Sequence, residues 1–323
     1  MAERSRIDRL DQAIEALLAR SAAPPSVDSE IEPLVTLAAG LRHLPRTGFR
    51  AALKSDLTRR APVTMTTPAK DYRRPGLRTL TPYLVVTGAA RLIDFFKAAF
   101  GAEEMLRVPR PDGSIMHAEV QIGDSRVELA DASERYGSIA VEIHLYVPDA
   151  DAAYQRAIAA GAASLYAPMD QEYGDREAGV KDPAGNHWYL ATHRLAPGRY
   201  APAGLHDVTP CLHARGAEQL LEFLKQAFLA EEFEIYRNPE GAIVHGKVRV
   251  GDSMLEIAEA HGQWGPMPGN LHLYVPDADS IYRRALAAGA TSTVEPSDTD
   301  YGDRFSGVVD AVGNRWYIAT HLR

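Results

Sequence analysis

Two histidines and one glutamate recur at the same spacing in two parts of this sequence, and together they could bind a metal ion. The two sets are His117, Glu128 and His144, and His245, Glu256 and His272. Two imidazoles and one carboxylate are donors that suit a divalent transition metal. The alternative is structural, because a histidine on a strand often only hydrogen-bonds to a neighbouring carboxylate. The residues alone leave both interpretations open.

A hairpin turn fixes how the first set is arranged. Gly123 and Asp124 separate two runs of alternating apolar and polar residues, which is typical of a two-residue β-hairpin. Pairing outward from that turn, Glu119 faces Glu128, and His117 lies diagonally across from Glu128 on the same face of the sheet. We therefore predict that these three side chains project into one site.

Glu119 and Glu128 are the candidates for proton transfer. Two facing carboxylates disfavour joint ionisation, so without a cation the pKa of one of them should be raised, which suits a general acid or base. In the second set, Lys247 takes the place of Glu119, where it would form a cross-strand ion pair with Glu256 and weaken cation binding. We therefore expect the first set to mark the active site.

Aromatic and arginine side chains near these strands could bind an organic ligand. The candidates are Tyr146, Tyr189, Trp188, Tyr274, Tyr317, Arg176 and Arg304. The rings could stack on a flat molecule, and the guanidinium groups could bind an anion. Two alternatives stay open: aromatic residues in strands are commonly core residues, and each arginine could instead pair with the aspartate before it, Asp175 or Asp303.

A tandem repeat must position all of these residues. A shift of 128 residues aligns residues 81–193 with residues 209–321 without a gap, and 57 of the 113 aligned pairs are identical. The Gly-Asp-Ser signature of residues 123–125 recurs at 251–253, and the Tyr-Gly-Asp-Arg signature of residues 173–176 recurs at 301–304. Each copy is therefore one structural unit.

Each copy is predicted to hold two βαβββ halves, which places the chain in the α+β class. In the first copy we predict strands at 82–86, 115–122, 126–130, 143–147, 179–180 and 187–192, and helices at 89–100 and 150–160. Gly101 and Gly161 stand where these helices should end.

Five segments divide the chain. They are a helical extension at 1–61, a linker at 62–79, a first domain at 80–193, a second linker at 194–206 and a second domain at 207–323. Apolar stripes in the extension predict two helices, which could dock a protein partner.

Composition narrows the class of protein. Of the 323 residues, 46% are hydrophobic and 24% are charged, which indicates ordinary folded domains. The net charge of −8 and the pI of about 5.8 argue against a nucleic-acid partner. A single cysteine, Cys211, allows no disulfide within the chain. With neither a signal peptide nor a membrane-spanning run, we expect a soluble, cytoplasmic protein without a membrane partner.

Both copies resemble the glyoxalase, bleomycin-resistance and dioxygenase superfamily, also called vicinal oxygen chelate proteins, and within it the PhnB-like branch. In the first copy the resemblance rests on Thr81-Pro82-Tyr83-Leu84, Ile93-Asp94-Phe95-Phe96, Tyr173-Gly174-Asp175-Arg176 and Asp182-Pro183-Ala184-Gly185-Asn186. It implies that two βαβββ halves of one copy face each other and enclose a cup for metal and substrate. Two copies would then supply two cups and pack as a pseudo-symmetric pair, in a monomer or a homodimer.

The family's metal ligands can be compared with the residues present. By resemblance, the first-strand ligand falls on Thr81 and the last-strand ligand on Tyr189, with Thr209 and Tyr317 in the second copy. The mid-copy ligand is kept as Glu128 and Glu256, and the fifth-strand ligand falls on Glu142 or His144, with Asn270 or His272 opposite. The family's metal site is therefore expected to be degenerate, and the cofactor is either absent or a divalent metal ion.

Two functions follow as expectations from this resemblance. The first is binding or sequestration of a small organic molecule, as in the bleomycin-resistance members. The alternative is an enzyme of the glyoxalase, dioxygenase or isomerase type, in which a divalent metal polarises the substrate and a glutamate moves protons. A third interpretation is a regulatory sensor that docks through the N-terminal helices.

Overall fold

The computed structural model describes residues 71–195, 198–262 and 264–322, which belong to one compact unit, Lys70–Arg323. The predicted helical extension at 1–61, its suggested partner site and the first half of the linker at 62–79 lie outside these residues. None of the described helices is long and apolar enough to cross a lipid bilayer.

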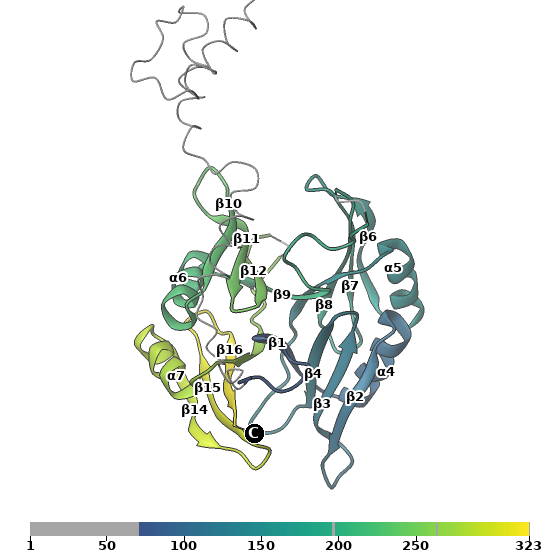
Figure 1. Cartoon of the computed structure of the whole chain (residues 1–323). Helices are drawn as coiled ribbons and strands as arrows, with labels where there is room; N and C mark the ends of the chain where they lie inside the picture. Colours follow the sequence, from purple (N-terminus) through teal and green to yellow (C-terminus); the bar gives the residue numbers. More distant parts are fainter. Residues whose placement is uncertain (1–70, 196–197, 263, 323) are drawn as a thin grey trace, which may run out of the picture. The chain divides into compact units, whose positions relative to one another are not determined.

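Each copy contains two βαβββ halves, as the sequence predicts (Figure 1). The first copy holds β1 (Leu80–Val86), α4 (Ala89–Phe100), β2 (Glu103–Pro109), β3 (Ile115–Ile122), β4 (Ser125–Asp131), β5 (Glu142–Tyr146), α5 (Ala150–Ala159), β6 (Ala163–Asp170), β7 (Asp175–Lys181) and β8 (His187–His193). The second copy holds β9 (Val208–Ala214), α6 (Ala217–Phe228), β10 (Glu231–Arg237), β11 (Ile243–Val250), β12 (Ser253–Glu259), β13 (Asn270–Tyr274), α7 (Ala278–Ala287), β14 (Thr291–Asp298), β15 (Asp303–Val309) and β16 (Arg315–His321). Gly101 ends α4 in the left-handed conformation, with a φ of 66°.

Halves of different copies share each eight-stranded sheet. Sheet I has the order β14-β15-β16-β13-β1-β4-β3-β2, and sheet II has the order β10-β11-β12-β9-β5-β8-β7-β6. The two copies do form a pseudo-symmetric pair, but the expectation that each cup lies within one copy is wrong. The reason is that a strand of one copy pairs with a strand of the other at the centre of each sheet. There β1 pairs antiparallel with β13, and β5 pairs antiparallel with β9. Because β5 reads Glu-Ile-His-Leu-Tyr and β13 reads Asn-Leu-His-Leu-Tyr, the sequence pattern could not choose between them as the partner of β1.

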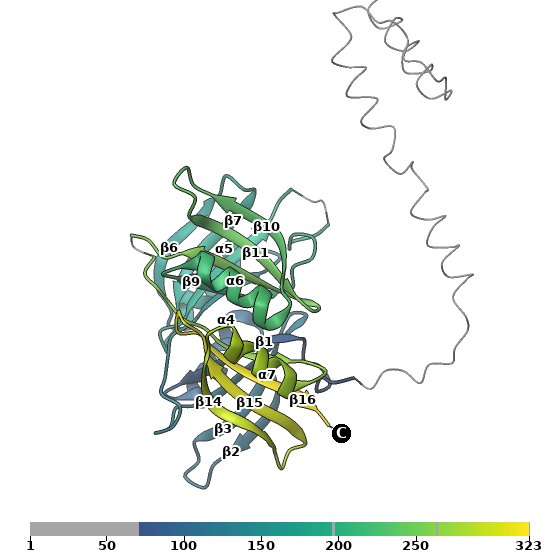
Figure 2. The same ribbon diagram turned by 90° about the vertical axis from the view of Figure 1, so that its left-hand side faces the viewer.

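The helices cover one face of each sheet, which we call the outer face, and leave the other as the inner face. α4 packs beside α5, and α6 packs beside α7 on the opposite side of the molecule (Figures 1 and 2). The main core of the first copy joins Phe96 of α4, Ala153 of α5 and Trp188 of β8. The apolar core therefore lies mainly within one copy, whereas each inner face is shared between the copies.

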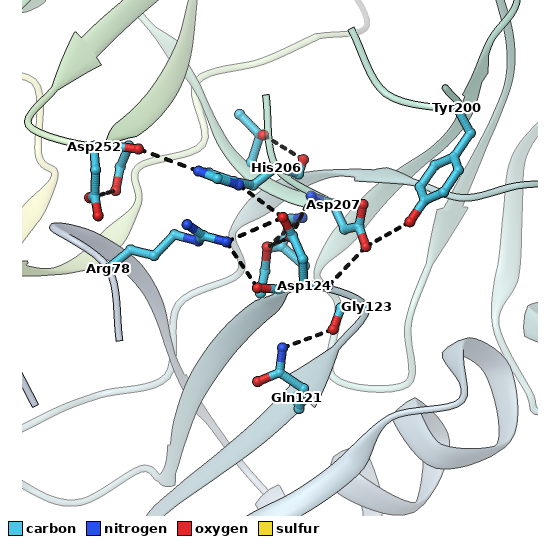
Figure 3. Close-up of polar contacts among 12 residues, drawn as sticks. Arg78, Gln121, Gly123, Asp124, Tyr200, His206, Asp207 and Asp252 are labelled. Carbon is cyan, nitrogen blue, oxygen red and sulfur yellow. Dashed lines mark hydrogen bonds and ion pairs between the residues drawn. The ribbon is translucent and has the colours of Figure 1, made fainter. Parts of the chain in front are cut away.

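The Gly-Asp-Ser turn between β3 and β4 hydrogen-bonds to the residues that begin the second copy. The Oδ1 of Asp124 accepts a hydrogen bond from the N–H of Asp207 at 3.0 Å, and the Oγ of Ser125 accepts one from the first N–H of β9 at 3.2 Å. Figure 3 shows Asp124 between Arg78 and His206, which occupy matching positions in the two copies.

The second Gly-Asp-Ser turn makes the same contacts with the first copy. The Oδ1 of Asp252 accepts from the N–H of Thr79 at 2.9 Å, and the Oγ of Ser253 accepts from the N–H of Leu80 at 3.0 Å. The sequence predicted these signatures only as hairpin turns, yet their side chains also fix the two copies together.

Candidate functional site

Alternation along β3 turns polar side chains to the inner face of sheet I. Ala118 and Val120 lie in the core beneath α4, so His117 and Glu119 point to the opposite face. Glu119 pairs in register with Glu128 of β4. The hairpin register predicted from the sequence is therefore confirmed.

Three of the predicted site residues converge on this face. The Nε2 of His117 lies 3.5 Å from a carboxylate oxygen of Glu119 and 3.9 Å from one of Glu128. The donor atoms of the three side chains all lie within 4.8 Å of one another. The predicted third member, His144, is instead on the inner face of sheet II. His272 of the second copy takes its place, with its Nδ1 2.8 Å from Glu128.

His117 and two guanidinium groups hold Glu119 in its ionised form. Arg126 Nη1 lies 2.6 Å from one carboxylate oxygen of Glu119, and Arg74 Nη1 lies 3.6 Å from the other. Burial, the largest single influence, would raise the pKa of Glu119, but the hydrogen bond with His117 and the charges of His117, Arg74 and Arg126 outweigh it and lower that pKa. The raised pKa expected at one of the two facing carboxylates is therefore not found at Glu119.

His144 bridges two buried carboxylates on sheet II. Its Nδ1 lies 3.0 Å from Glu256, and its Nε2 lies 3.2 Å from Glu177. Burial opposes the charged imidazole, but Glu256 and Glu177 together raise the pKa of His144 to about 10. His144 is therefore an imidazolium at neutral pH, and a charged imidazole does not bind a metal.

His245 and Lys247 lie beside this bridge on β11. His245 Nε2 is 3.9 Å from Glu256. Lys247 pairs in register with Glu256, as predicted, but its Nζ lies 3.0 Å from Glu234 of the neighbouring strand β10. The predicted ion pair with Glu256 is wrong, because Glu256 is already paired with His144.

The four predicted tyrosines lie on the inner faces. They are Tyr146 and Tyr189 on sheet II, and Tyr274 and Tyr317 on sheet I. Tyr146 stacks on His144 with ring centroids 4.4 Å apart, and Tyr274 lies at the same distance from His272. These contacts place the rings beside the buried histidines.

The predicted tryptophan and arginines lie on the outer faces. Trp188 is fully buried and packs against Phe96 of α4, with ring centroids 5.1 Å apart. Arg176 pairs with Asp151 at the start of α5 at 2.8 Å, and Arg304 makes the matching pair with α7. These three side chains therefore do not line a ligand site, because strand alternation turns them towards the helices.

Sheet II contains a cavity of about 580 Å³ at its inner face. Its lining residues are Glu142, Leu165, Tyr166, Met169, Gln171, Tyr173, Glu177, His187, Trp264, Gly265, Pro266 and Met267. The ring of Trp264 lies edge-on to Tyr166 at 6.1 Å and to Tyr189 at 5.7 Å. Aromatic side chains thus line the cavity together with two buried carboxylates, Glu142 and Glu177.

Glu142 is the most strongly shifted acid of this cavity. It accepts hydrogen bonds from Tyr189 at 2.7 Å and from His213 at 2.5 Å, and His187 Nδ1 is 3.7 Å away. Burial alone would raise its pKa, but the nearby imidazole of His187, the hydrogen bond and charge of His213 and the hydrogen bond from Tyr189 lower it to about 2. The pKa of Glu177 is also lowered, against burial, chiefly by its ion pair with His144 and then by the hydrogen bonds from Tyr166 and Tyr173.

Four of five polar residues on this face were not predicted as site residues, and the fifth, Glu142, was predicted only as one of two alternatives for the fifth-strand ligand, although the repeat contains a signal for all five. Glu142, Glu177, His187, Cys211 and His213 stand where the other copy has Asn270, Phe305, Arg315, Tyr83 and Val85. Residues that break the repeat on inner-face positions therefore mark where the two faces differ in chemistry.

The structure shows which residues lie next to the first-strand position, Thr81. Thr81 pairs with His272, whereas the residue paired with Glu128 is Tyr83. On sheet II the residue paired with Glu256 is Cys211.

Comparisons with known proteins agree with this fold. The sequence profile of the Glyoxalase/Bleomycin resistance protein/Dioxygenase superfamily matches residues 78–190 and 210–318, so the chain belongs to this superfamily. An uncharacterized protein of Mycobacterium bovis is 44% identical over 122 residues, which cover 34% of this chain and 80% of that protein. An uncharacterized protein of Mycobacterium tuberculosis has the same identity, with 72% of its length covered.

Two solved structures share the fold across most of the chain. Glyoxalase I from Zea mays has a TM-score of 0.57 and 14% identity, covering 75% of this chain and 92% of its own. A putative dioxygenase from Bacillus subtilis has a TM-score of 0.51 and 13% identity, covering 74% and 83%. Identities this low show a common architecture and leave the chemistry to be argued from the residues.

Members of this superfamily often use divalent metal ions, and sheet I offers donors of suitable types. Glu128 Oε1 and His272 Nε2 are buried and have no hydrogen-bond partner among the described residues. Together with His117 and Glu119 they supply two imidazoles and two carboxylates. The guanidinium groups beside Glu119 oppose a further cation, so the set fits a metal in donor type but not in net charge.

Proposed function

We propose that this protein recognises a small, flat organic molecule in the cavity of sheet II, as a binding or sequestering protein of the bleomycin-resistance type. The observation that carries the proposal is the cavity of about 580 Å³, walled by aromatic rings over buried carboxylates. Its volume lies within the range of roughly 300 to 1,000 Å³ that is typical of small-molecule sites.

The walls suit a planar ligand. Tyr166, Tyr173 and Trp264 line the cavity together with the apolar side chains of Leu165 and Met267. Aromatic faces contribute about 0.5–1.5 kcal/mol per stacked pair beyond simple burial. A flat ring system would therefore gain both apolar burial and stacking.

The charges define which ligand is preferred. Glu142 and Glu177 line the cavity and are ionised at neutral pH, since the pKa of each is lowered. The described lining residues include no lysine or arginine. The ligand that fits is a planar cation or a ring carrying several hydrogen-bond donors, because the charged groups that line the cavity are carboxylates, which accept hydrogen bonds and repel an anion.

Tryptophan fluorescence tests this proposal directly. The chain has three tryptophans; Trp188 and Trp316 are fully buried in the cores, whereas Trp264 lines the cavity. We expect saturable quenching by an aminoacridinium cation, weaker quenching by neutral acridone, and the weakest by an acridine carboxylate. Quenching by none of the three, or equal quenching by all, would contradict the proposal.

Calorimetry with a matched pair of variants supplies the control. Trp264→Ala should weaken aminoacridinium binding roughly 10-fold, which corresponds to about 1.4 kcal/mol. Tyr136→Ala changes the matching position of the other copy and should leave the affinity unchanged. Recovery of the ligand in its original form distinguishes sequestration from turnover.

A divalent-metal-dependent enzyme is the second candidate, and the cluster of His117, Glu119 and Glu128 favours it. In this interpretation a metal would sit on the inner face of sheet I, and a glutamate would move protons. Stoichiometric metal that is retained in Glu256→Gln but lost in Glu128→Gln would support it. Loss in both variants, or in neither, would contradict it.

A further inference from the structure

A thiol, an imidazole and a carboxylate meet on the inner face of sheet II. Glu142 of β5 pairs directly with Cys211 of β9, and His213 follows two residues along β9 on the same face. The donor atoms of these three side chains all lie within 4.8 Å of one another. Hydrogen-bonded strands at the centre of a sheet therefore hold all three donors.

The cluster is shielded from bulk solvent but borders the cavity. The side chains of Glu142 and His213 are 1% and 13% exposed, and Cys211 is 8% exposed. Glu142 and His187 line the cavity. The Nδ1 of His187 is buried and has no hydrogen-bond partner in the described part of the chain, although it lies only 3.7 Å from Glu142. A fourth donor is thus available at the edge of the cluster.

The other copy provides an internal comparison. The positions that match Glu142, Cys211, His213 and His187 hold Asn270, Tyr83, Val85 and Arg315. The central strands have the same register on both sheets, since Thr81 of β1 pairs with His272 of β13 as Thr209 of β9 pairs with His144 of β5. The fold alone therefore does not require these donors at the centre of a sheet.

The types of donor atom in this cluster indicate which metal ion it would prefer. A thiolate sulfur, an imidazole nitrogen and a carboxylate oxygen are the three kinds of ligand that zinc takes in proteins, usually in a tetrahedral set of four. Harder cations such as magnesium and calcium prefer oxygen ligands alone. A mixed sulfur, nitrogen and oxygen set at this spacing therefore favours zinc.

We propose that Glu142, Cys211 and His213 bind a zinc ion on the inner face of sheet II, with His187 positioned to become the fourth ligand. On binding, the thiol of Cys211 and the Nδ1 of His213 each release a proton to solvent, and the hydrogen bond between His213 and Glu142 is replaced by bonds to the metal. This site shares no residue with the cluster of His117, Glu119 and Glu128. It borders the proposed ligand cavity through Glu142 and His187, and it can be tested with metal alone.

Cobalt substitution provides a direct test on the full chain. Because Cys211 is the single cysteine of the chain, any thiolate-to-cobalt charge-transfer absorption can come only from it. Protein stripped with a chelator should bind one Co²⁺ per chain with this absorption, and Zn²⁺ should displace the cobalt and abolish the band. Saturation with cobalt without a charge-transfer band would overturn the proposal in the wild-type protein, whatever the variants do.

Three variants locate the site, and two of them use residues that the other copy already carries at these positions. Glu142→Asn and His213→Val should each weaken zinc binding at least about 10-fold, and Cys211→Ser should remove the charge-transfer band. The control Glu128→Gln should leave both the affinity and the band unchanged. Cobalt that is lost in Glu128→Gln but kept in Cys211→Ser would assign the metal to sheet I and overturn the proposal.

Discussion

His272 Nδ1 lies 2.8 Å from the carboxylate of Glu128, a residue 144 positions earlier in the sequence and in the other copy of the repeat. The same bond recurs with the copies reversed, between His144 and Glu256 at 3.0 Å. In each of these two pairs the glutamate comes from one copy and the histidine from the other. Neither of these glutamate–histidine pairs can therefore form within a single copy of the repeat.

A double-mutant cycle should detect the pairing of Glu128 with a histidine of the other copy. We expect Glu128→Gln and His272→Asn to show a coupling of about 1–3 kcal/mol in the free energy of unfolding, because they remove one buried, hydrogen-bonded pair. Glu128→Gln and His144→Asn, which belong to one copy but to different sheets, should be additive within about 0.5 kcal/mol. Coupling in the second pair and additivity in the first would refute the pairing of Glu128 with His272 across the two copies. Denaturant unfolding of the four variants and the wild type provides the measurement.

Substitution of Gly123 should weaken the hydrogen-bonded contact between the β3–β4 turn and the start of the second copy. Gly123 has a φ of +56°, and a Cβ there would collide with the side chain of Asp207, whose Oδ2 accepts hydrogen bonds from Asp124 and Tyr200 (Figure 3). Gly113 has a φ of +84° with open space around it. Gly113→Ala should cost about 1 kcal/mol of stability, and Gly123→Ala a further 1–3 kcal/mol. Equal costs would mean that Asp207 moves aside freely.

Asp131 should make stability depend on pH. Its carboxylate accepts hydrogen bonds from the N–H groups of Gly88 and Ala89 at the start of α4, and from Ile115. Burial would raise its pKa, but these backbone donors lower it below its usual value of 3.8. A lowered pKa in the folded state adds stability above the unfolded pKa and loses it as the pH falls.

Asp131→Asn should therefore destabilise the protein by about 1–2 kcal/mol at pH 7, and by less as the pH falls below about 4. Unfolding free energies of the variant and the wild type between pH 7 and pH 3.5 provide the comparison. Asp94→Asn, at an exposed position of the same helix, is the control and should change little at any pH. A cost of Asp131→Asn that stays constant with pH would exclude the carboxylate charge as its source.

Two neighbours on β7 should affect ligand binding differently. Glu177 lines the cavity, whereas Arg176 pairs with α5 on the outer face. Glu177→Gln should weaken binding of the aminoacridinium probe by roughly 5- to 30-fold, about 1–2 kcal/mol, through loss of a buried charge. Arg176→Gln should leave it unchanged and lower stability by less than about 1 kcal/mol, because its ion pair is largely exposed. A larger effect of Arg176→Gln on binding would place the ligand site elsewhere.

The sequence determined the local structure of this protein. Periodicity and turn residues predicted α4, its end at Gly101, and the β3–β4 hairpin with Glu119 opposite Glu128, since these features depend on residues close together in the chain. The edge strand β2 was not predicted, because its side chains alternate between exposed and partly exposed and make no apolar run.

Only the tertiary structure decided which halves meet. β5 and β13 carry nearly the same residues, so either could satisfy the free edge of β1, and hydrogen-bond pairing between strands does not depend on which copy supplies them. The sets His117, Glu128, His272 and His245, Glu256, His144 follow from that choice. The cavity of sheet II does too, because it combines Glu142, Tyr166 and Glu177 of the first copy with Trp264 of the second. Residues so far apart in the sequence meet only when two strands pair across the centre of a sheet, and no local pattern encodes that pairing.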